Sequence, residues 1–164
     1  MKENYKLNQI IIPLLAWYDS HARRLPWRQT TAPYQIWVSE IMLQQTKVET
    51  VIPYYNRFIE QLPDMKSLAE AKEERLLKLW EGLGYYSRAR HMQKTAQTIM
   101  TRFSGQFPQS YQDILSLPGI GQYTAGAIAS ICFGQPVAAI DGNVLRVITR
   151  LTDCADDISA PAVK

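Results

Sequence analysis

Cysteine and histidine are scarce in this sequence, and their scarcity excludes two kinds of small protein. The 164 residues include only two cysteines, Cys132 and Cys154, and two histidines. Two cysteines cannot form a disulfide framework, and with two histidines they give no four-ligand metal set. We therefore expect no metal ligands in this chain. With 46% hydrophobic residues, the chain can draw its stability from an apolar core instead.

Long apolar runs are also missing. The most apolar stretch, residues 125–140, is interrupted by glycine, glutamine and proline, which argues against a membrane span. The first residues, MKENYKLNQ, lack the apolar region of a secretory signal. These absences predict an intracellular, cytoplasmic protein with reduced cysteines and no membrane partner.

Acidic residues are absent from one long stretch. Between residues 82 and 112 there is none, whereas basic side chains lie there at Arg88, Arg90, Lys94 and Arg102. The net charge of the whole chain is only +3, so total charge is a weak argument for a nucleic-acid partner. A one-sided basic surface favours contact with phosphates. A solvated helix face would explain the same residues equally well.

Helical periodicity dominates the chain, and no convincing strand pattern occurs. Three residues are expected N-caps of the helices that follow them, namely Ser67, Ser87 and Asp141. Short helices with short connections predict an all-α fold. The expected helices cover residues 8–21, 34–44, 47–61, 67–71, 73–81, 87–103, 110–115, 123–133 and 141–151.

The segment LPGIGQYTAGAI, residues 117–128, is the most informative part of the sequence. Gly119 and Gly121 permit a tight hairpin whose backbone N–H groups point outward, and the following helix adds its N-terminal dipole. Leu117 and Ile120 would anchor this hairpin between two helices. Residues 110–133 thus read as a helix-hairpin-helix element, which grips the DNA backbone without reading sequence. For the PGIG motif alone, an ordinary turn between helices is the alternative.

Two carboxylates are candidates for acid–base chemistry. Glu40 lies in VSEIMLQQT, an otherwise apolar helix, where burial would raise its pKa as a general acid at neutral pH requires. Asp141 belongs to the segment IDGNVLR. Each residue by itself leaves a plainer interpretation open, because Glu40 could face solvent and Asp141 could simply cap a helix.

Four segments resemble the MutY family of adenine-specific DNA glycosylases, which belongs to the helix-hairpin-helix glycosylase superfamily. They are WVSEIMLQQTKVETVIPYY, LWEGLGYYSRAR, LPGIGQYTAGAI and DGNVLRV, in this order, and the resemblance runs from about residue 17 to residue 151. The resemblance implies a six-helix barrel lobe over residues 29–140. It also implies a second, incomplete lobe, made of the helix and linker at residues 1–28 and the start of an iron–sulfur lobe at residues 141–164.

The resemblance implies roles for particular residues. Glu40 matches the catalytic acid that protonates the adenine ring, and Asp141 matches the carboxylate that stabilises the oxocarbenium-like sugar, once the base is extruded from the duplex. Tyr123 and Asn143 match positions near the sugar. Other positions match residues that line the adenine pocket (Trp27, Arg28, Leu43) or enter the duplex near the opposing 8-oxoguanine (Gln45, Thr46, Leu83, Tyr85).

For the aromatic residues Trp27 and Tyr85, packing in the core is the alternative interpretation. Contacts to the DNA backbone are expected from the hairpin and from two arginines. The backbone-contacting set is Gly119, Ile120, Gly121, Tyr123, Thr124, Arg88 and Arg90.

Tyr123 also bears on the type of reaction. Bifunctional relatives that resemble endonuclease III carry a lysine at the corresponding position, and its amine forms a Schiff base with the sugar that leads to strand cleavage. A phenol cannot form an imine, and neither LPGIGQYTAGAI nor DGNVLR contains a lysine. We therefore expect hydrolytic base removal without lyase activity.

The sequence departs from the family in its cysteines. Family members carry a [4Fe–4S] cluster on four cysteines beyond the DGNV segment, and those ligands are absent here. Cys132 is expected to act as a small buried hydrophobic residue, and Cys154 lies before the expected cluster loop. We interpret the chain as the N-terminal catalytic portion of a longer protein, with the apolar faces of its first and last helices exposed.

The leading hypothesis is a monofunctional adenine glycosylase of base excision repair. It would act as a monomer on adenine opposite 8-oxoguanine or guanine in double-stranded DNA, at the nucleoid if the source is bacterial. Three alternatives stay open: a shortened chain without activity, a glycosylase of the same superfamily for another base, and a non-catalytic helix-hairpin-helix module that binds DNA.

Overall fold

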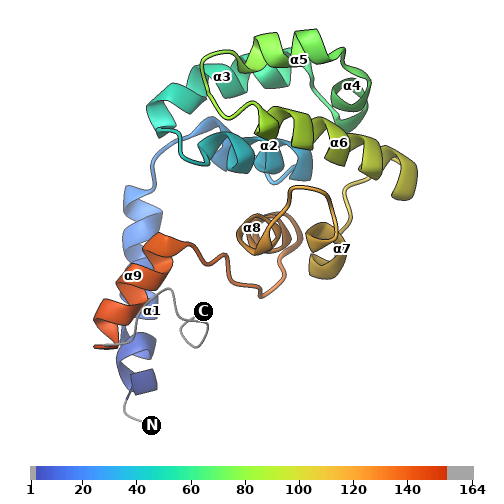
Figure 1. The fold of residues 1–164 in the computed structure, drawn as a ribbon. Coiled ribbons are helices and arrows are strands. Elements are labelled where there is room, and N and C mark those ends of the chain that lie inside the picture. The colour runs from blue at the N-terminus through green and yellow to red at the C-terminus, as the bar shows by residue number, and fades with distance from the viewer. Residues whose placement is uncertain (1–2, 155–164) are drawn as a thin grey trace. The chain divides into compact units, whose positions relative to one another are not determined.

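Apolar residues at helical spacing produce a succession of short helices in the computed structural model, which describes residues 3–154, with side chains from Asn8 onward (Figure 1). Within that range no strand occurs, so the predicted all-α fold is confirmed. The elements are α1 (Glu3–His21), a 3-10 helix η1 (Pro26–Arg28), α2 (Pro33–Leu43), α3 (Val48–Gln61), α4 (Met65–Glu70), α5 (Glu73–Trp80), α6 (Ser87–Arg102), α7 (Tyr111–Leu115), α8 (Gln122–Phe133) and α9 (Gly142–Leu151).

The chain divides into two units. Unit 1 consists of residues 1–24 and 140–164 and includes α1 and α9, whereas unit 2 consists of residues 25–139 and includes η1 and α2–α8. The lobe boundaries expected from the sequence, after residues 28 and 140, stay a prediction.

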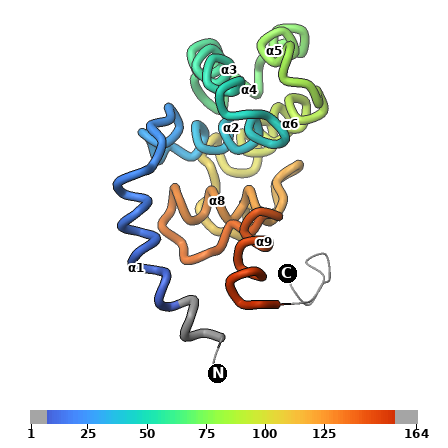
Figure 2. The backbone as a smooth tube through the Cα atoms, turned by 90° about the vertical axis from the view of Figure 1, so that its left-hand side faces the viewer, coloured from blue at the N-terminus to red at the C-terminus, as the bar shows by residue number. Residues whose placement is uncertain are grey.

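Unit 2 is built in tiers around one apolar core. Figures 1 and 2 show α3, α4 and α5 on one side of α2 and α6, and α8 on the other. In agreement with this order, α2 contacts both α3 and α8, while α6 contacts α4 and α5. The largest fully buried side chains are Trp37, Trp80 and Phe58, and the last two meet edge to face. Aromatic side chains of this size dominate the apolar area that a core removes from water.

Helix capping follows the sequence at one predicted position and departs from it at two. Asp141 caps α9, since its Oδ1 accepts hydrogen bonds from the backbone N–H groups of Asn143 at 3.0 Å and Val144 at 2.8 Å. The expectation for Ser67 was wrong, because Asp64 caps α4 and Ser67 completes a capping box from inside the helix. Ser87 is likewise the first residue of α6 and makes no cap.

Unit 1 presents apolar side chains on both of its helices. In α1, Ile12 is 74% exposed and Trp17 is 55% exposed. Helix α9 has no buried residue, and Val147 is 49% exposed. Within residues 3–154, none of the helices has the length and apolar character needed to cross a bilayer.

Candidate active site and duplex-contacting turns

Glu40 lies on α2, directly after the buried residues Trp37, Val38 and Ser39, and its own side chain is only partly exposed. Burial raises the pKa of the Glu40 carboxyl above its ordinary value of 4.5. A hydrogen bond from the Tyr123 hydroxyl favours the ionised form and partly opposes this rise. Helix α8 supplies Tyr123 and packs against α2. A carboxyl that keeps its proton closer to neutral pH is suited to general acid catalysis.

Cys132, also on α8, lies within the electrostatic reach of Glu40. Burial raises the pKa of its thiol to about 11, and the negative charge of Glu40 contributes to the rise. The thiol therefore remains protonated at neutral pH, which makes it a poor nucleophile. Cys132 is half-buried and packs against the apolar core, so the packing role expected from the sequence fits, although its exposure is greater than expected. Nothing in the sequence indicated its closeness to Glu40.

Asp141 and Asn143 lie at the start of α9 in unit 1. The hydrogen bond from the Val144 backbone N–H is the largest of several that lower the pKa of Asp141. Asn143 also donates its side-chain amide to Asp141 Oδ2 at 3.1 Å and accepts from Arg146 at 3.3 Å. The pKa values of Glu40 and Asp141 are thus shifted in opposite directions. A carboxyl of raised pKa can donate a proton, and a carboxyl of lowered pKa stays ionised and can stabilise a positive charge.

The hairpin between α7 and α8 has left-handed backbone at one of its two glycines, because Gly121, with a φ of −92°, is extended in a way that any residue could adopt. Gly119 adopts a φ of 73°, and the expected anchors Leu117 and Ile120 are buried, at 2% and 6% exposure. Helix α8 begins after Gly121, which offers no side chain to its N-terminal N–H groups. Such N–H groups have no acceptor within their own helix and can receive a phosphate oxygen. Thr124 is buried, so only its backbone could reach DNA.

The two turns predicted to enter the duplex share an unusual backbone. Gln45, just after α2, has a φ of 55°, and Tyr85, after α5, has a φ of 47°. Left-handed backbone costs a non-glycine residue about 1–2 kcal/mol, and such strain is concentrated at functional sites. Gln45 is exposed and Tyr85 is 63% exposed, whereas Leu83 is buried and Thr46 is half-buried. Of the four predicted residues, Gln45 and Tyr85 are therefore the two available to a partner.

The residues predicted to line the adenine pocket are in different environments. Trp27 lies on η1, is 5% exposed and meets Tyr55 edge to face at 5.3 Å between ring centroids. Leu43 is half-buried at the end of α2, and Arg28 is exposed. The 3-10 helix that holds Trp27 lies outside the helices expected from the sequence.

The two arginines predicted to contact the DNA backbone both have partners within the protein. Arg90 forms an exposed ion pair with Glu73, at 2.7 Å between Nε and Oε1. The guanidinium of Arg88 is half-buried and donates to backbone carbonyls after α2 and after α5. Sequence reasoning missed this second arrangement, because an arginine in a basic segment gives no sign of which carbonyls it meets.

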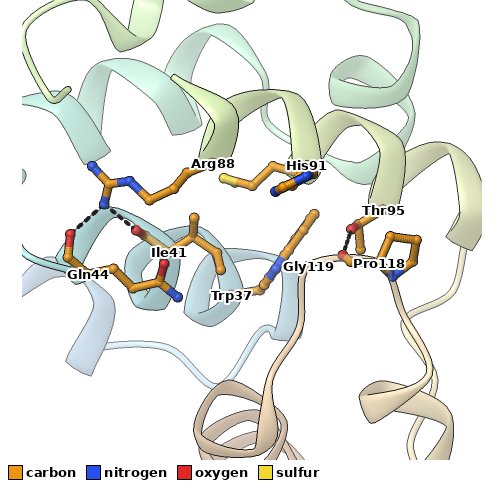
Figure 3. A pocket seen from close by; sticks show the side chains of 9 residues that line it. Trp37, Ile41, Gln44, Arg88, His91, Thr95, Pro118 and Gly119 are labelled. Carbon is orange, nitrogen blue, oxygen red and sulfur yellow. Dashed lines mark hydrogen bonds between the residues drawn. The ribbon is translucent and has the colours of Figure 1, made fainter. Parts of the chain in front are cut away.

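A small pocket of about 60 Å³ lies between α2, α6 and the hairpin (Figure 3). The buried donors Trp37 Nε1 and Arg88 Nε have no acceptor among the described residues. The pocket is therefore suited to a small hydrogen-bond acceptor such as water. It does not include Glu40, and its lining residues are Trp37, Ile41, Gln44, Arg88, His91, Met92, Thr95, Pro118 and Gly119.

Comparisons with known proteins place the chain in a family. A profile described as the HhH-GPD superfamily of base excision DNA repair proteins matches residues 38–164. Adenine DNA glycosylase of Buchnera aphidicola (subsp. Baizongia pistaciae) is 49% identical over 138 residues, which cover 84% of this chain and 39% of that protein. Adenine DNA glycosylase of Mus musculus is 45% identical over 159 residues, which cover 92% of this chain and 31% of that protein. The chain thus spans less than half the length of these relatives.

Solved structures share the fold. A thermostable thymine-DNA glycosylase superimposes with a TM-score of 0.84 at 28% identity, covering 89% of this chain and 68% of that one. Endonuclease III in a trapped covalent intermediate with DNA superimposes with a TM-score of 0.76, covering 94% of this chain and 71% of that one. At 24% identity, this second likeness is a likeness of fold alone.

Proposed function

The chain belongs to the HhH-GPD superfamily of base excision DNA repair proteins, and from that membership we propose that it is a monofunctional DNA glycosylase. Its substrate would be adenine mispaired with 8-oxoguanine or guanine in double-stranded DNA. The relatives named adenine DNA glycosylase support the choice of base. One observation carries the proposal. Glu40, whose carboxyl has a raised pKa, is hydrogen-bonded to Tyr123, which lies on α8, the helix that follows the hairpin.

The proposed reaction assigns one task to each carboxyl. With the base extruded from the stack, Glu40 donates its proton to the adenine ring, and the electrons of the glycosidic bond leave with the base. The ionised Asp141, oriented by Asn143, stabilises the positive charge that develops on the sugar. Water then adds to the sugar carbon and gives up a proton, which restores the acid. The opposite pKa shifts of the two carboxyls support this division of tasks.

The proposal excludes an imine intermediate between the protein and the sugar. Tyr123, the residue beside Glu40, has no amine to form an imine with the sugar. The exposed N-terminus of α8 and the residues Gln45 and Tyr85 would hold the duplex, with Trp27, Arg28 and Leu43 around the adenine. We propose in addition that residues 29–140 correspond to the barrel lobe and that the protein acts as a monomer on intracellular DNA.

The iron–sulfur cluster of the family does not fit this chain. A [4Fe–4S] cluster takes four cysteine ligands, and the sequence has two cysteines. The described residues hold no group of three or more histidine, cysteine or acidic side chains that could bind a metal ion. No step of the proposed reaction passes through a cluster, and we propose that cluster ligands belong to the parts of longer relatives that this chain does not span.

Base release in a single turnover tests the proposal. A labelled duplex with adenine opposite 8-oxoguanine is incubated with excess protein, and strand breaks are measured with and without alkali. We expect breaks only after alkali, and a loss of at least 100-fold in rate for Glu40→Gln because general acid catalysis contributes about 10²–10⁴-fold. Glu60→Gln, which removes an exposed carboxyl on α3, is the matched control and should react like the unchanged protein.

Other outcomes would favour other functions. Breaks without alkali, or a borohydride-trapped adduct, would contradict the hydrolytic mechanism. Release of thymine but not adenine would favour a different base, an alternative that the likeness to thymine-DNA glycosylase supports. Duplex binding that Glu40→Gln leaves unchanged, with no base release on any mispair, would favour the non-catalytic module.

A further inference from the structure

Arg88 holds the end of α2. Its Nη1 donates hydrogen bonds to the backbone carbonyls of Ile41 at 2.8 Å and Gln44 at 2.6 Å (Figure 3), and to that of Met42 at 3.3 Å. The last carbonyls of a helix receive no hydrogen bond from within the helix, so a cationic donor there satisfies them and interacts favourably with the helix dipole. Gln44 is the residue that directly precedes Gln45. Arg88 therefore fixes the backbone from which Gln45 projects.

The other half of the same guanidinium holds the turn after α5. Arg88 Nη2 donates to the carbonyls of Leu83 at 3.1 Å and Gly84 at 3.3 Å, which directly precede Tyr85. The guanidinium also lies over the ring of Tyr85, at 5.6 Å from its centroid, and over the ring of Trp80, at 5.4 Å. A cation over an aromatic face is attracted by the ring. The side chain of Tyr85 is thus oriented by the group that fixes its backbone.

We infer that Arg88 is a positioning residue that joins the two turns carrying Gln45 and Tyr85, so that both side chains meet the duplex as one rigid unit. The inference rests on the proposed function for what the turns do, although the clamp itself is a property of the protein without DNA. It also gives the strained backbone of the two residues a cause: both left-handed residues follow carbonyls that the same guanidinium binds.

Only an arginine can make this connection. Its planar fork directs Nη1 and Nη2 to different acceptors at once, whereas a lysine has a single ammonium on a flexible stem. The arrangement also argues against the simpler interpretation of Arg88 as a phosphate contact, because both terminal nitrogens are already directed to carbonyls within the protein. A guanidinium committed in this way would have to break several hydrogen bonds to reach DNA.

Hydrogen exchange without DNA tests the clamp directly. The backbone N–H of Thr46 is bonded to the carbonyl of Leu43, and that of Leu83 to the carbonyl of Trp80. In Arg88→Met we expect exchange at both amides to accelerate together, by about tenfold or more, while amides within α3 keep their rates. Arg75→Met is the matched control, since Arg75 also donates to a backbone carbonyl of another element, that of Gln61 at 3.0 Å, but touches neither turn.

Acceleration at neither amide or at one alone, or a uniform acceleration over all helices, would overturn the inference. Arg88→Lys covers the case in which Arg88→Met does not fold, because the lysine side chain keeps the charge and the aliphatic stem and lacks only the planar fork. In Arg88→Lys we expect the backbone N–H of Thr46, that of Leu83, or both to exchange faster than in the unchanged protein. Unchanged exchange at both would contradict the clamp.

Base release then tests the consequence. Misplacing contacts by about 1 Å can cost about 100-fold in rate, so we expect Arg88→Met to slow single-turnover release by roughly 10–100-fold. Its dissociation constant for the duplex should change far less, because the hairpin contacts are intact. Equal losses in binding and rate would indicate a direct phosphate contact instead. If the unchanged protein releases no base, the proposed function fails, and hydrogen exchange still decides the clamp.

Discussion

The burial that suits Glu40 to acid catalysis also means that its ionised form lowers the free energy of unfolding. A carboxyl whose native pKa lies above its unfolded value binds more protons in the native state, between those two pKa values, than in the unfolded state. The free energy of unfolding therefore falls as the pH rises through that window, from 4.5, the ordinary value, up to the raised pKa. Below the window the protonated carboxyl adds no such cost.

Glu40→Gln should remove this pH dependence. We expect the variant to gain stability relative to the unchanged protein as the pH rises from 4.5 toward neutrality, because the amide is never ionised. Urea unfolding at several pH values measures the difference, in which contributions from other titrating groups cancel. Parallel stability curves for the two proteins would mean that the pKa of Glu40 is not raised. The comparison needs no DNA and no activity.

Single residues also mark the limit of what the sequence could predict. The caps and anchors of the hairpin and of α9 depend on neighbours within a few positions, and Gly119, Ile120 and Asp141 behave as predicted. The acceptors of Arg88 within the protein could not be predicted in this way, because the one at Ile41 lies 47 positions away in the sequence. Which carbonyls a guanidinium meets is decided by the packing of α6 against other helices, and no local pattern encodes it.

At the scale of helices, boundaries were predictable where sequence and capping agree. The expected helix over residues 34–44 is α2 at Pro33–Leu43, and the one over residues 73–81 is α5 at Glu73–Trp80. The predicted start of α4 was wrong, because two polar residues there can each act as the N-cap. Asp64 and Ser67 are three positions apart, and the reciprocal bonds of a capping box make the first of them the cap. The sequence pattern allowed either residue.

The turn after α5 depends on Gly82, and its replacement should be much more damaging than that of Gly84. Gly82 has a φ of 100°, and a Cβ there would collide with the hydroxyl oxygen of Tyr54. Gly84 has a φ of 69° and no atom within 4 Å of such a Cβ. We expect Gly84→Ala to cost about 1 kcal/mol from backbone strain alone, and Gly82→Ala about 1–2 kcal/mol more, because the half-buried side chain of Tyr54 must shift to admit the methyl group.

Urea unfolding of the two alanine variants measures this difference, and Tyr54→Phe separates its two causes. In the double variant Gly82→Ala with Tyr54→Phe, the oxygen that the new methyl group meets is gone, so the steric part of the loss should be recovered and the backbone part should remain. Equal losses for Gly82→Ala and Gly84→Ala would show that the contact with Tyr54 is of no consequence to the turn.

Stability and chemistry are distributed unequally over the whole molecule. Every residue of the buried apolar cluster, from Leu25 to Ala129, belongs to unit 2. Unit 1 contains Asp141 and Asn143 but no buried residue of α9. Glu40, the proposed acid, and the turns proposed to hold the duplex thus belong to unit 2, which contains the core. Asp141, the proposed anion, belongs to unit 1. The sequence predicted the residues of both sets, but patterns of single helices could not reveal where the core ends.

This distribution predicts that residues 25–139 fold alone. Because buried apolar area is the main favourable contribution to folding, a protein of these residues should unfold cooperatively in urea, with a midpoint close to that of unit 2 in the whole chain. It should still bind duplex DNA through the hairpin and the two turns. It should release no adenine, because Asp141 is missing. A broad, non-cooperative transition would mean that residues outside this range stabilise the core, and base release by the shortened protein would mean that Asp141 is not required for the chemistry.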